Sequence, residues 1–247
     1  MNYREIEPTD VLKDYIKFFW VYENLDEDIE HTILPDACFD LLADFQDGVL
    51  QDVILTGIWT QPISVTVSKG TTLLALRFKL PAADVLFAKE IKSNLNTMCS
   101  LPLSFWNINQ FKSPDFNAFI ATLQNQFKKQ LEQLDRIDTC KLKLFDAIYH
   151  DKAQSVKALS EQIAWSSRQI NRYLDKQFGI SAKTLLQICR CNAAYKDLAN
   201  GQLYPSNTHV DQSHFIKEVK KYTWTTPRDL SKNKNDRFLQ LSVEKDN

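Results

Sequence analysis

The chain has 247 residues, of which 44% are hydrophobic and 25% are charged, and its formal net charge is −1. That length and apolar content are enough for one large packed domain or two ordinary ones, and they argue against a disordered chain. Five cysteines without a C-x-x-C pair argue against a disulfide framework or a zinc finger. The charged N-terminal sequence MNYREIEPTD predicts neither export nor a membrane segment, so we expect a cytoplasmic protein.

The small net charge hides an asymmetry along the chain. Residues 1–150 contain 14 Lys and Arg against 21 Asp and Glu, a net charge of −7. Residues 151–235 contain 14 Lys and Arg against 7 Asp and Glu, a net charge of +7. A basic segment of this kind favours a polyanionic partner, and a solvated basic surface without a partner is the alternative.

Short apolar runs separated by turn residues predict a sheet in the first part of the chain. The runs are residues 31–45, 49–57, 63–67 and 71–80. Val65 and Val67 alternate with Thr66 as in a half-buried strand, whereas residues 72–78 are apolar enough to lie inside a small barrel or sandwich.

Beyond Pro81 the apolar residues recur with the period of a helix. A long helix is predicted to begin at Ser113-Pro114-Asp115 and to close a first domain of residues 1–135. Its apolar stripe consists of Phe116, Phe119, Ile120, Leu123, Phe127, Leu131 and Leu134.

The rest of the chain to residue 235 is predicted to be helical. Asp138 can cap one helix, and Ser166 with Gln169 makes a capping box for another, which Gly179 ends in a left-handed conformation. A short helix lies between these two and is marked by Val156, Leu159 and Ile163. A short helix, a tight turn and a capped basic helix are the plan of a helix-turn-helix DNA reader.

The capped helix begins SSRQINR, which places Ser167, Arg168, Asn171 and Arg172 on the face away from the core. Guanidinium forks and amides are the groups that pair bidentately with base edges in the major groove. We therefore predict that these four residues contact DNA.

Three stretches of this region resemble the AraC/XylS family of transcription regulators. VKALSEQIAWSSRQINRYLDKQFGIS resembles the first helix-turn-helix of the family, and DQSHFIKEVKKYTWTTPRDL resembles its second recognition helix and closing motif. TLLQICRCNAAYKDLANG resembles the long helix that joins the two units. The resemblance implies an AraC-like DNA-binding domain, which we place at residues 136–235, followed by a tail of residues 236–247.

Three N-terminal segments, LPDACFDLL, GIWTQP and LRFKLPAADVLF, resemble an uncharacterised domain that is often fused in front of such DNA readers. This second resemblance assigns no chemistry.

The resemblance implies that the segment after Asp211 is a second reading helix, in which Gln212, Ser213, His214 and Lys217 contact DNA. Two departures from the family pattern concern this unit. Trp224 stands where a helix-ending glycine is usual.

The lead-in to that helix, LYPSNTHV, contains Pro205, Ser206 and Asn207 where a regular helix is expected. It is also shorter than usual by about a turn and a half. We therefore expect a weakly supported second helix and base reading mainly by the first unit.

A metal site is the alternative interpretation of His31, Asp36, Cys38 and Asp40, which cluster in sequence. With four histidines in the chain and no H-x-H pair, we favour a turn acid, a buried thiol and a strand-end acid. Three tryptophans raise the alternative of a ligand pocket, although core packing is their commoner use. They are Trp20, Trp59 and Trp106.

Enzyme signatures such as G-x-S-x-G, H-E-x-x-H and the Gly-rich phosphate loops do not occur in the sequence. We expect no catalytic residue, metal or cofactor. The predicted fold class is α+β, with a β-rich mixed domain followed by an all-α helix-turn-helix domain.

The predicted function is sequence-specific binding of double-stranded DNA by a transcription regulator that responds to a small-molecule effector. We also predict that the chain can form a homodimer and that it does not bind a membrane. The alternative is an effector-sensing or protein-interaction module whose DNA reader has degenerated.

Overall fold

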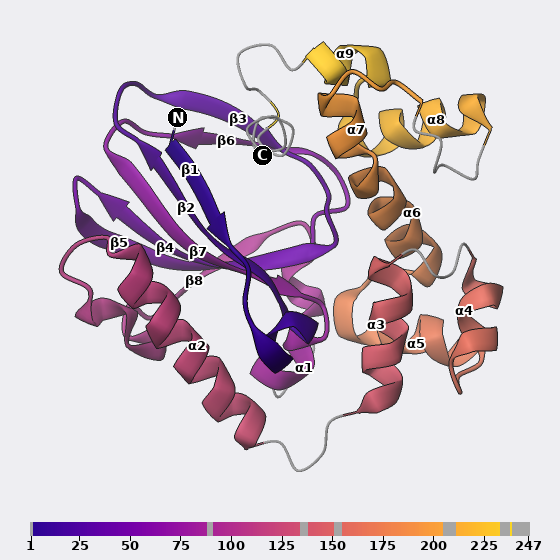
Figure 1. Ribbon diagram of the computed structural model, residues 1–247, viewed down its shortest axis with the longest axis horizontal. Helices are drawn as coiled ribbons and strands as arrows, with labels where there is room; N and C mark the ends of the chain where they lie inside the picture. The colour runs from indigo at the N-terminus through magenta and orange to yellow at the C-terminus, as the bar shows by residue number, and fades with distance from the viewer. Residues whose placement is uncertain are drawn as a thin grey trace.

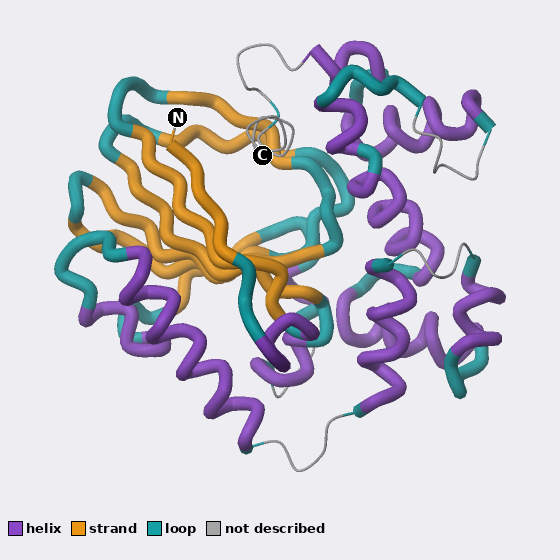
Figure 2. Tube along the Cα trace, in the orientation of Figure 1, coloured by secondary structure: helices purple, strands orange, loops and turns teal. Residues whose placement is uncertain are grey.

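Strands fill the N-terminal part of the chain and helices fill the rest (Figure 1), which confirms the predicted α+β class. Figure 2 shows the same division, with the strands gathered on one side and most helices on the other. The computed structural model describes residues 2–87, 91–133, 138–150, 155–204, 211–232 and 238. Within these ranges, no helix is both long enough and apolar enough to cross a membrane.

Six antiparallel strands form the main sheet in the order β1-β2-β7-β4-β5-β8. Their bounds are β1 (Asn2–Ile6), β2 (Ile16–Asn24), β4 (Cys38–Gln46), β5 (Val49–Thr56), β7 (Thr71–Lys79) and β8 (Met98–Leu101). A second antiparallel pair consists of β3 (Ile29–Ile33) and β6 (Ile63–Val67). Each of the four predicted apolar runs contains a strand, whereas β1, β2 and β8 were not predicted.

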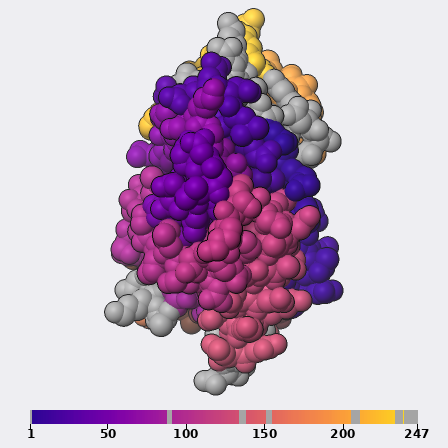
Figure 3. All heavy atoms as spheres, turned by 90° about the vertical axis from the view of Figure 1, so that its left-hand side faces the viewer, coloured from indigo at the N-terminus to yellow at the C-terminus, as the bar shows by residue number. Residues whose placement is uncertain are grey.

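Alternation along the strands gives the main sheet two different faces. On β7, Leu74, Leu76 and Phe78 belong to the main core, and this face is covered by α2 (Phe116–Glu132). Phe127 of α2 packs against Phe78 with ring centroids 5.7 Å apart. Seen from the left of Figure 1, the indigo to pink atoms of the N-terminal half make up most of the visible surface (Figure 3).

The predicted long helix is confirmed as α2, and Asp115 is its N-cap because its carboxylate accepts a hydrogen bond from the Ala118 N–H at 3.0 Å. Leu134, the last residue of the predicted stripe, lies outside the described residues, as does the predicted domain boundary at 135 and 136. Short helical segments also lie between the strands and between β8 and α2. They are η1 (Asp10–Asp14), α1 (Ala82–Leu86), η2 (Lys92–Asn94) and η3 (Phe105–Gln110).

Seven helices were found in the described part of the C-terminal half. They are α3 (Thr139–Tyr149), α4 (Val156–Gln162), α5 (Ser167–Phe178), α6 (Ala182–Ala193), α7 (Tyr195–Ala199), α8 (Gln212–Thr223) and α9 (Pro227–Lys232). The predicted caps at Asp138 and Ser166 are confirmed, and Gly179 ends α5 with a φ of 74°.

The single joining helix implied by the family resemblance is wrong in detail, because a turn at Ala194 separates α6 from α7. The Ala194 N–H bonds to the Cys191 carbonyl at 3.1 Å, three residues back, which tightens the backbone there.

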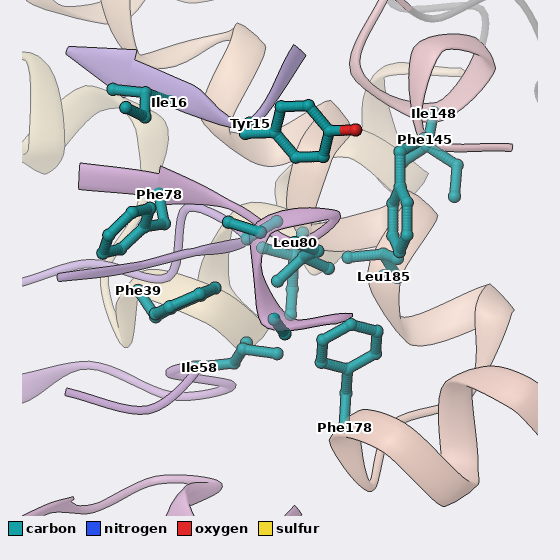
Figure 4. Packing of buried hydrophobic residues seen from close by; sticks show 14 of the residues in the cluster. Tyr15, Ile16, Phe39, Ile58, Phe78, Leu80, Phe145, Ile148, Phe178 and Leu185 are labelled. Atoms are coloured by element: carbon teal, nitrogen blue, oxygen red, sulfur yellow. The ribbon is translucent and has the colours of Figure 1, made fainter. Parts of the chain in front are cut away.

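One hydrophobic core runs through both halves of the molecule. Leu80, just after β7, lies between the strand residues Phe39 and Phe78 and the helix residues Phe145 and Leu185 (Figure 4). The β-rich and helical halves are therefore packed together through buried apolar side chains, and this contact positions the candidate site.

Candidate nucleic-acid interface

The first candidate reading helix, α5, is anchored by one apolar face and exposes two cations. Ile170, Leu174 and Phe178 are buried, and the Ser166–Gln169 capping box fixes the start of the helix. Arg168 and Arg172 are exposed one turn apart, as predicted. Their guanidinium groups have the geometry for bidentate pairing with bases or phosphates.

Ser167 and Asn171, the other two predicted contact residues of α5, are only half exposed, and their side chains bond to neighbouring helices. The Ser167 hydroxyl donates to the Ser160 hydroxyl of α4 at 3.3 Å. The Asn171 amide donates to the Ser167 carbonyl and accepts from the Ala182 N–H, both at 3.0 Å. These side chains join α5 to α4 and to the start of α6.

The C-terminal half of α5 is held by the β-rich half of the chain. Tyr173 donates its hydroxyl to Asp84 Oδ2 of α1 at 2.7 Å, and Lys141 Nζ of α3 lies 3.0 Å from the same oxygen. Burial raises the pKa of Tyr173, and the adjacent Asp84 raises it further, so the hydroxyl stays a donor. The Ile91 N–H donates to the Gln177 carbonyl at 3.0 Å. A movement of Asp84 or Ile91 would therefore be transmitted to α5.

The second candidate reading helix, α8, begins at the predicted cap. The Asp211 carboxylate accepts from the His214 N–H at 2.9 Å and from the Ser213 hydroxyl at 2.7 Å. The Ser213 bond and then the His214 N–H lower the pKa of Asp211. The four predicted contact residues are all exposed on this helix. They are Gln212, Ser213, His214 and Lys217.

The expectation that α8 is weakly supported is wrong, because a buried ionic contact joins it to α6. The Glu218 side chain is 8% exposed and lies 3.2 Å from Arg190 Nη1. Gln187 donates to the same carboxylate at 3.2 Å and accepts from the Tyr222 hydroxyl at 3.0 Å. The sequence gives no local sign of this support, since the partners are about thirty residues apart.

The helix that precedes α8 is short, as expected from the sequence. This helix, α7, has five residues. Pro205, Ser206 and Asn207 lie outside the described residues.

Trp224 ends α8 in the left-handed conformation, with φ 57° and ψ 13°. Its N–H still bonds to the Lys220 carbonyl at 3.0 Å. A residue with a Cβ pays roughly 1–2 kcal/mol for this conformation, and glycine does not. The side chain is 66% exposed, so burial does not compensate for the strained backbone.

The acids of the alternative metal site are held by a cation instead. Arg77 lies 2.9 Å from Asp36 through Nη1 and 2.9 Å from Asp40 through Nε. Burial, followed by the neighbouring Asp36, raises the pKa of the Cys38 thiol to about 12, so the thiol is protonated at neutral pH. In the described ranges, no three His, Cys, Asp or Glu side chains gather as a metal site would require.

His31 of the metal-site alternative and Trp20 of the ligand-pocket alternative are both part of the packing. His31 is buried with its Nε2 2.8 Å from the Tyr22 hydroxyl. Trp20 is buried, stacks on Tyr3 and donates its indole N–H to Asp40 at 3.1 Å.

A cavity of about 360 Å³ lies between the β-rich half and helices α3 and α6. Its lining residues are Glu7, Pro8, Lys13, Ile16, Lys17, Asp36, Lys79, Tyr149, His150, Cys189, Asn192 and Ala193. Lys79 donates to the Lys13 carbonyl at 2.7 Å, and burial lowers the pKa of Lys79. Three ammonium groups at one cavity favour an anion.

Residues 35–37 connect this cavity to the helices. Tyr149 of α3 donates its hydroxyl to the Ala37 carbonyl at 2.8 Å and accepts from the Leu80 N–H at 2.9 Å. Tyr195 of α7 donates to the Pro35 carbonyl at 3.3 Å. A molecule in the cavity would thus lie beside the contacts that hold the two halves together.

Comparison with known proteins gives limited similarity. A family model described as a domain of unknown function, DUF6597, matches residues 4–100. No curated protein shows significant sequence similarity to the chain.

Two similar solved structures are of ToxT from Vibrio cholerae. An apo ToxT variant from strain SCE256 is 12% identical with a TM-score of 0.42, and the match covers 85% of this chain and 96% of that one. ToxT from strain O395, bound to (E)-4-(8-methylnaphthalen-1-yl)but-3-enoic acid, is 10% identical with a TM-score of 0.42, covering 97% and 98%. At this level of similarity, function has to be inferred from the residues of the chain itself.

Proposed function

We propose that the chain is a transcription regulator that binds double-stranded DNA through α5 and α8. The observation that carries this proposal is a pair of capped helices, each packed on α6, that bury their apolar faces and expose polar and basic side chains. The exposed residues proposed to contact DNA are Arg168 and Arg172 on α5 and Gln212, Ser213, His214 and Lys217 on α8. The resemblance to AraC/XylS regulators supports the same function.

Both helices take part in this proposal. Base reading mainly by the first unit was expected because α8 seemed poorly supported, and the Glu218–Arg190 contact removes that reason. Two reading helices on one chain would contact DNA about one helical turn apart, ~34 Å. The short lead-in to α8 still supports the alternative of a degenerate reader, but the Glu218–Arg190 contact argues that α8 itself is held in place.

A first prediction concerns the DNA contacts. If about five cations reach phosphates, the slope of log K against log salt should be near −4 to −5. Arg172→Ala should cost about 1–3 kcal/mol on a duplex selected from a random library, and less on random duplexes. Gln212→Ala should also act selectively, because α8 is firmly held. Fluorescence anisotropy at several salt concentrations measures both effects.

The matched control for these variants is Lys128→Ala, which removes an exposed cation from α2 in the other half. It should leave DNA affinity nearly unchanged. Absence of binding by the full chain at low salt would contradict the proposed function. Equal effects of Arg172→Ala and Lys128→Ala would contradict the role of α5.

The cavity between the two halves is the effector site in this proposal. Lys13, Lys17 and Lys79 supply positive charge, and Ile16 and the Tyr149 ring supply apolar surface. We expect an anionic small molecule, because three ammonium groups outnumber the two carboxylates, Glu7 and Asp36, at the cavity, and Asp36 is already paired with Arg77. Homodimerisation, the cytoplasmic location and the division into two domains stay predictions.

A second prediction tests this site with a panel of aromatic and aliphatic monocarboxylates and their matched primary amides. A bound carboxylate at about 100 times its Kd should stabilise the fold by about 2.7 kcal/mol and raise the melting temperature. The uncharged amides should have little effect. Lys17→Gln should abolish the shift, whereas Lys69→Gln, in an exposed turn, should retain it. Equal shifts with acids and amides would contradict an anion site.

A further inference from the structure

Three exposed residues lie along α8, and a fourth, Trp224, is the C-cap just after it. Ser213, Lys217, Lys220 and Trp224 are separated by four, three and four residues, which is the spacing of a single helix face. The opposite face is buried and contains Phe215, Val219 and Tyr222. Trp224 therefore continues the line of residues that begins in the first turn of the helix.

Folding alone gives no reason for a tryptophan at this position. The residue adopts a left-handed conformation that glycine adopts without strain, and 66% of its side chain is exposed. A strained residue with an exposed aromatic ring is a feature that a binding partner can explain. The partner would cover the ring and would meet the rest of that line of residues at the same time.

The charges around Trp224 identify the class of partner. Lys217, Lys220, Lys221 and Arg228 are exposed in α8 and α9, whereas Glu218 is buried and paired and Asp229 is the one exposed acid of these two helices. A polyanion fits this surface. The indole of Trp224 has an N–H that can donate to a phosphate oxygen and a flat apolar ring that can cover a deoxyribose.

We propose that Trp224 contacts the sugar-phosphate backbone of duplex DNA at the edge of the groove that α8 enters. This inference rests on the proposed function. It adds a non-ionic backbone contact to the ionic ones, and such a contact positions α8 without reading sequence.

The test compares Trp224→Gly with the wild-type chain on the same selected duplex. Affinity should fall roughly tenfold at every salt concentration, because a charged-acceptor hydrogen bond and a ring contact are lost. The slope of log K against log salt should not change, since no counterion is released at an uncharged side chain. The melting temperature should rise, because glycine relieves the left-handed strain.

Three further variants make the result specific. Lys220→Ala should lower the salt slope by about one, unlike Trp224→Gly. Leu25→Ala, which removes a 63% exposed apolar side chain from the other half, should leave affinity unchanged. Trp224→Phe keeps the ring without the N–H and should fall between wild type and Trp224→Gly.

Acrylamide quenching supplies an independent measurement. DNA should protect the wild-type fluorescence from quenching, and this protection should be smaller in Trp224→Phe. If the wild-type chain binds DNA but Trp224→Gly binds equally well and Trp224 stays quenchable, the proposed contact is wrong and a protein surface becomes the partner to test. If the wild-type chain binds no DNA, the proposed function itself fails and the contact fails with it.

Discussion

Arg77→Met is expected to lower the free energy of unfolding by about 3–5 kcal/mol, because it leaves two buried carboxylates without their cation. Arg77 binds Asp40 through two nitrogens, both at 2.9 Å, and Asp36 through a third. Burial disfavours the charged guanidinium, but Asp40 and then Asp36 outweigh it and hold the pKa of Arg77 above its ordinary value. Urea denaturation at neutral pH measures the loss.

Two controls separate charge from packing in this prediction. Lys69→Met removes an exposed cation and should change stability by no more than about 0.5 kcal/mol. Arg77→Lys keeps the charge but lacks the planar fork, so it should recover only part of the loss. If Arg77→Met is no more harmful than Lys69→Met, the carboxylates do not depend on Arg77.

The second large effect is expected from Arg190→Met, which leaves the Glu218 carboxylate buried beside Gln187. The expected loss is about 2–3 kcal/mol, less than for Arg77 because Arg190 is partly solvated. The loss should be concentrated in α8. Hydrogen exchange should accelerate in α8 far more than in α5, and discrimination between selected and random DNA should weaken.

The double variant Arg190→Met with Glu218→Leu is the matched control for this experiment. Replacing both partners with apolar side chains removes the unpaired charge and should restore much of the stability. Unchanged exchange in α8 of Arg190→Met would show that the helix is held by its apolar face alone. In that case Phe215, Val219 and Tyr222 would be sufficient support.

The features that could be predicted from sequence depend on residues close together in the chain. Asp115, Asp138 and Ser166 each cap the next few N–H groups, and Gly179 ends the helix to which it is attached. The signal and the structure lie within one turn of each other in every case. The order of helices from α3 to α5 was therefore predictable.

The features that were missed depend on contacts between distant residues. β2 is buried on both faces for much of its length, so it lacks the alternation of a half-buried strand. Arg77 could have been matched to Asp40 only from the register between β7 and β4, which places them opposite each other. Asn171 was predicted to face DNA because helical periodicity does not reveal that its side-chain oxygen, Oδ1, accepts a hydrogen bond from the Ala182 N–H.

The contacts between the β-rich half and α5 limit where the chain can be cut to make a chimera. Asp84 and Ile91 belong by sequence to the first half, yet they bond to Tyr173 and Gln177 of α5. A chimera joined near residue 136 would separate these pairs and expose the core around Leu80. A fragment that keeps these contacts with α5 must therefore begin before Asp84, and so before β8, the last strand of the sheet. A different N-terminal domain fused to the helices would have to provide an acceptor for Tyr173 and a donor for the Gln177 carbonyl at the same positions.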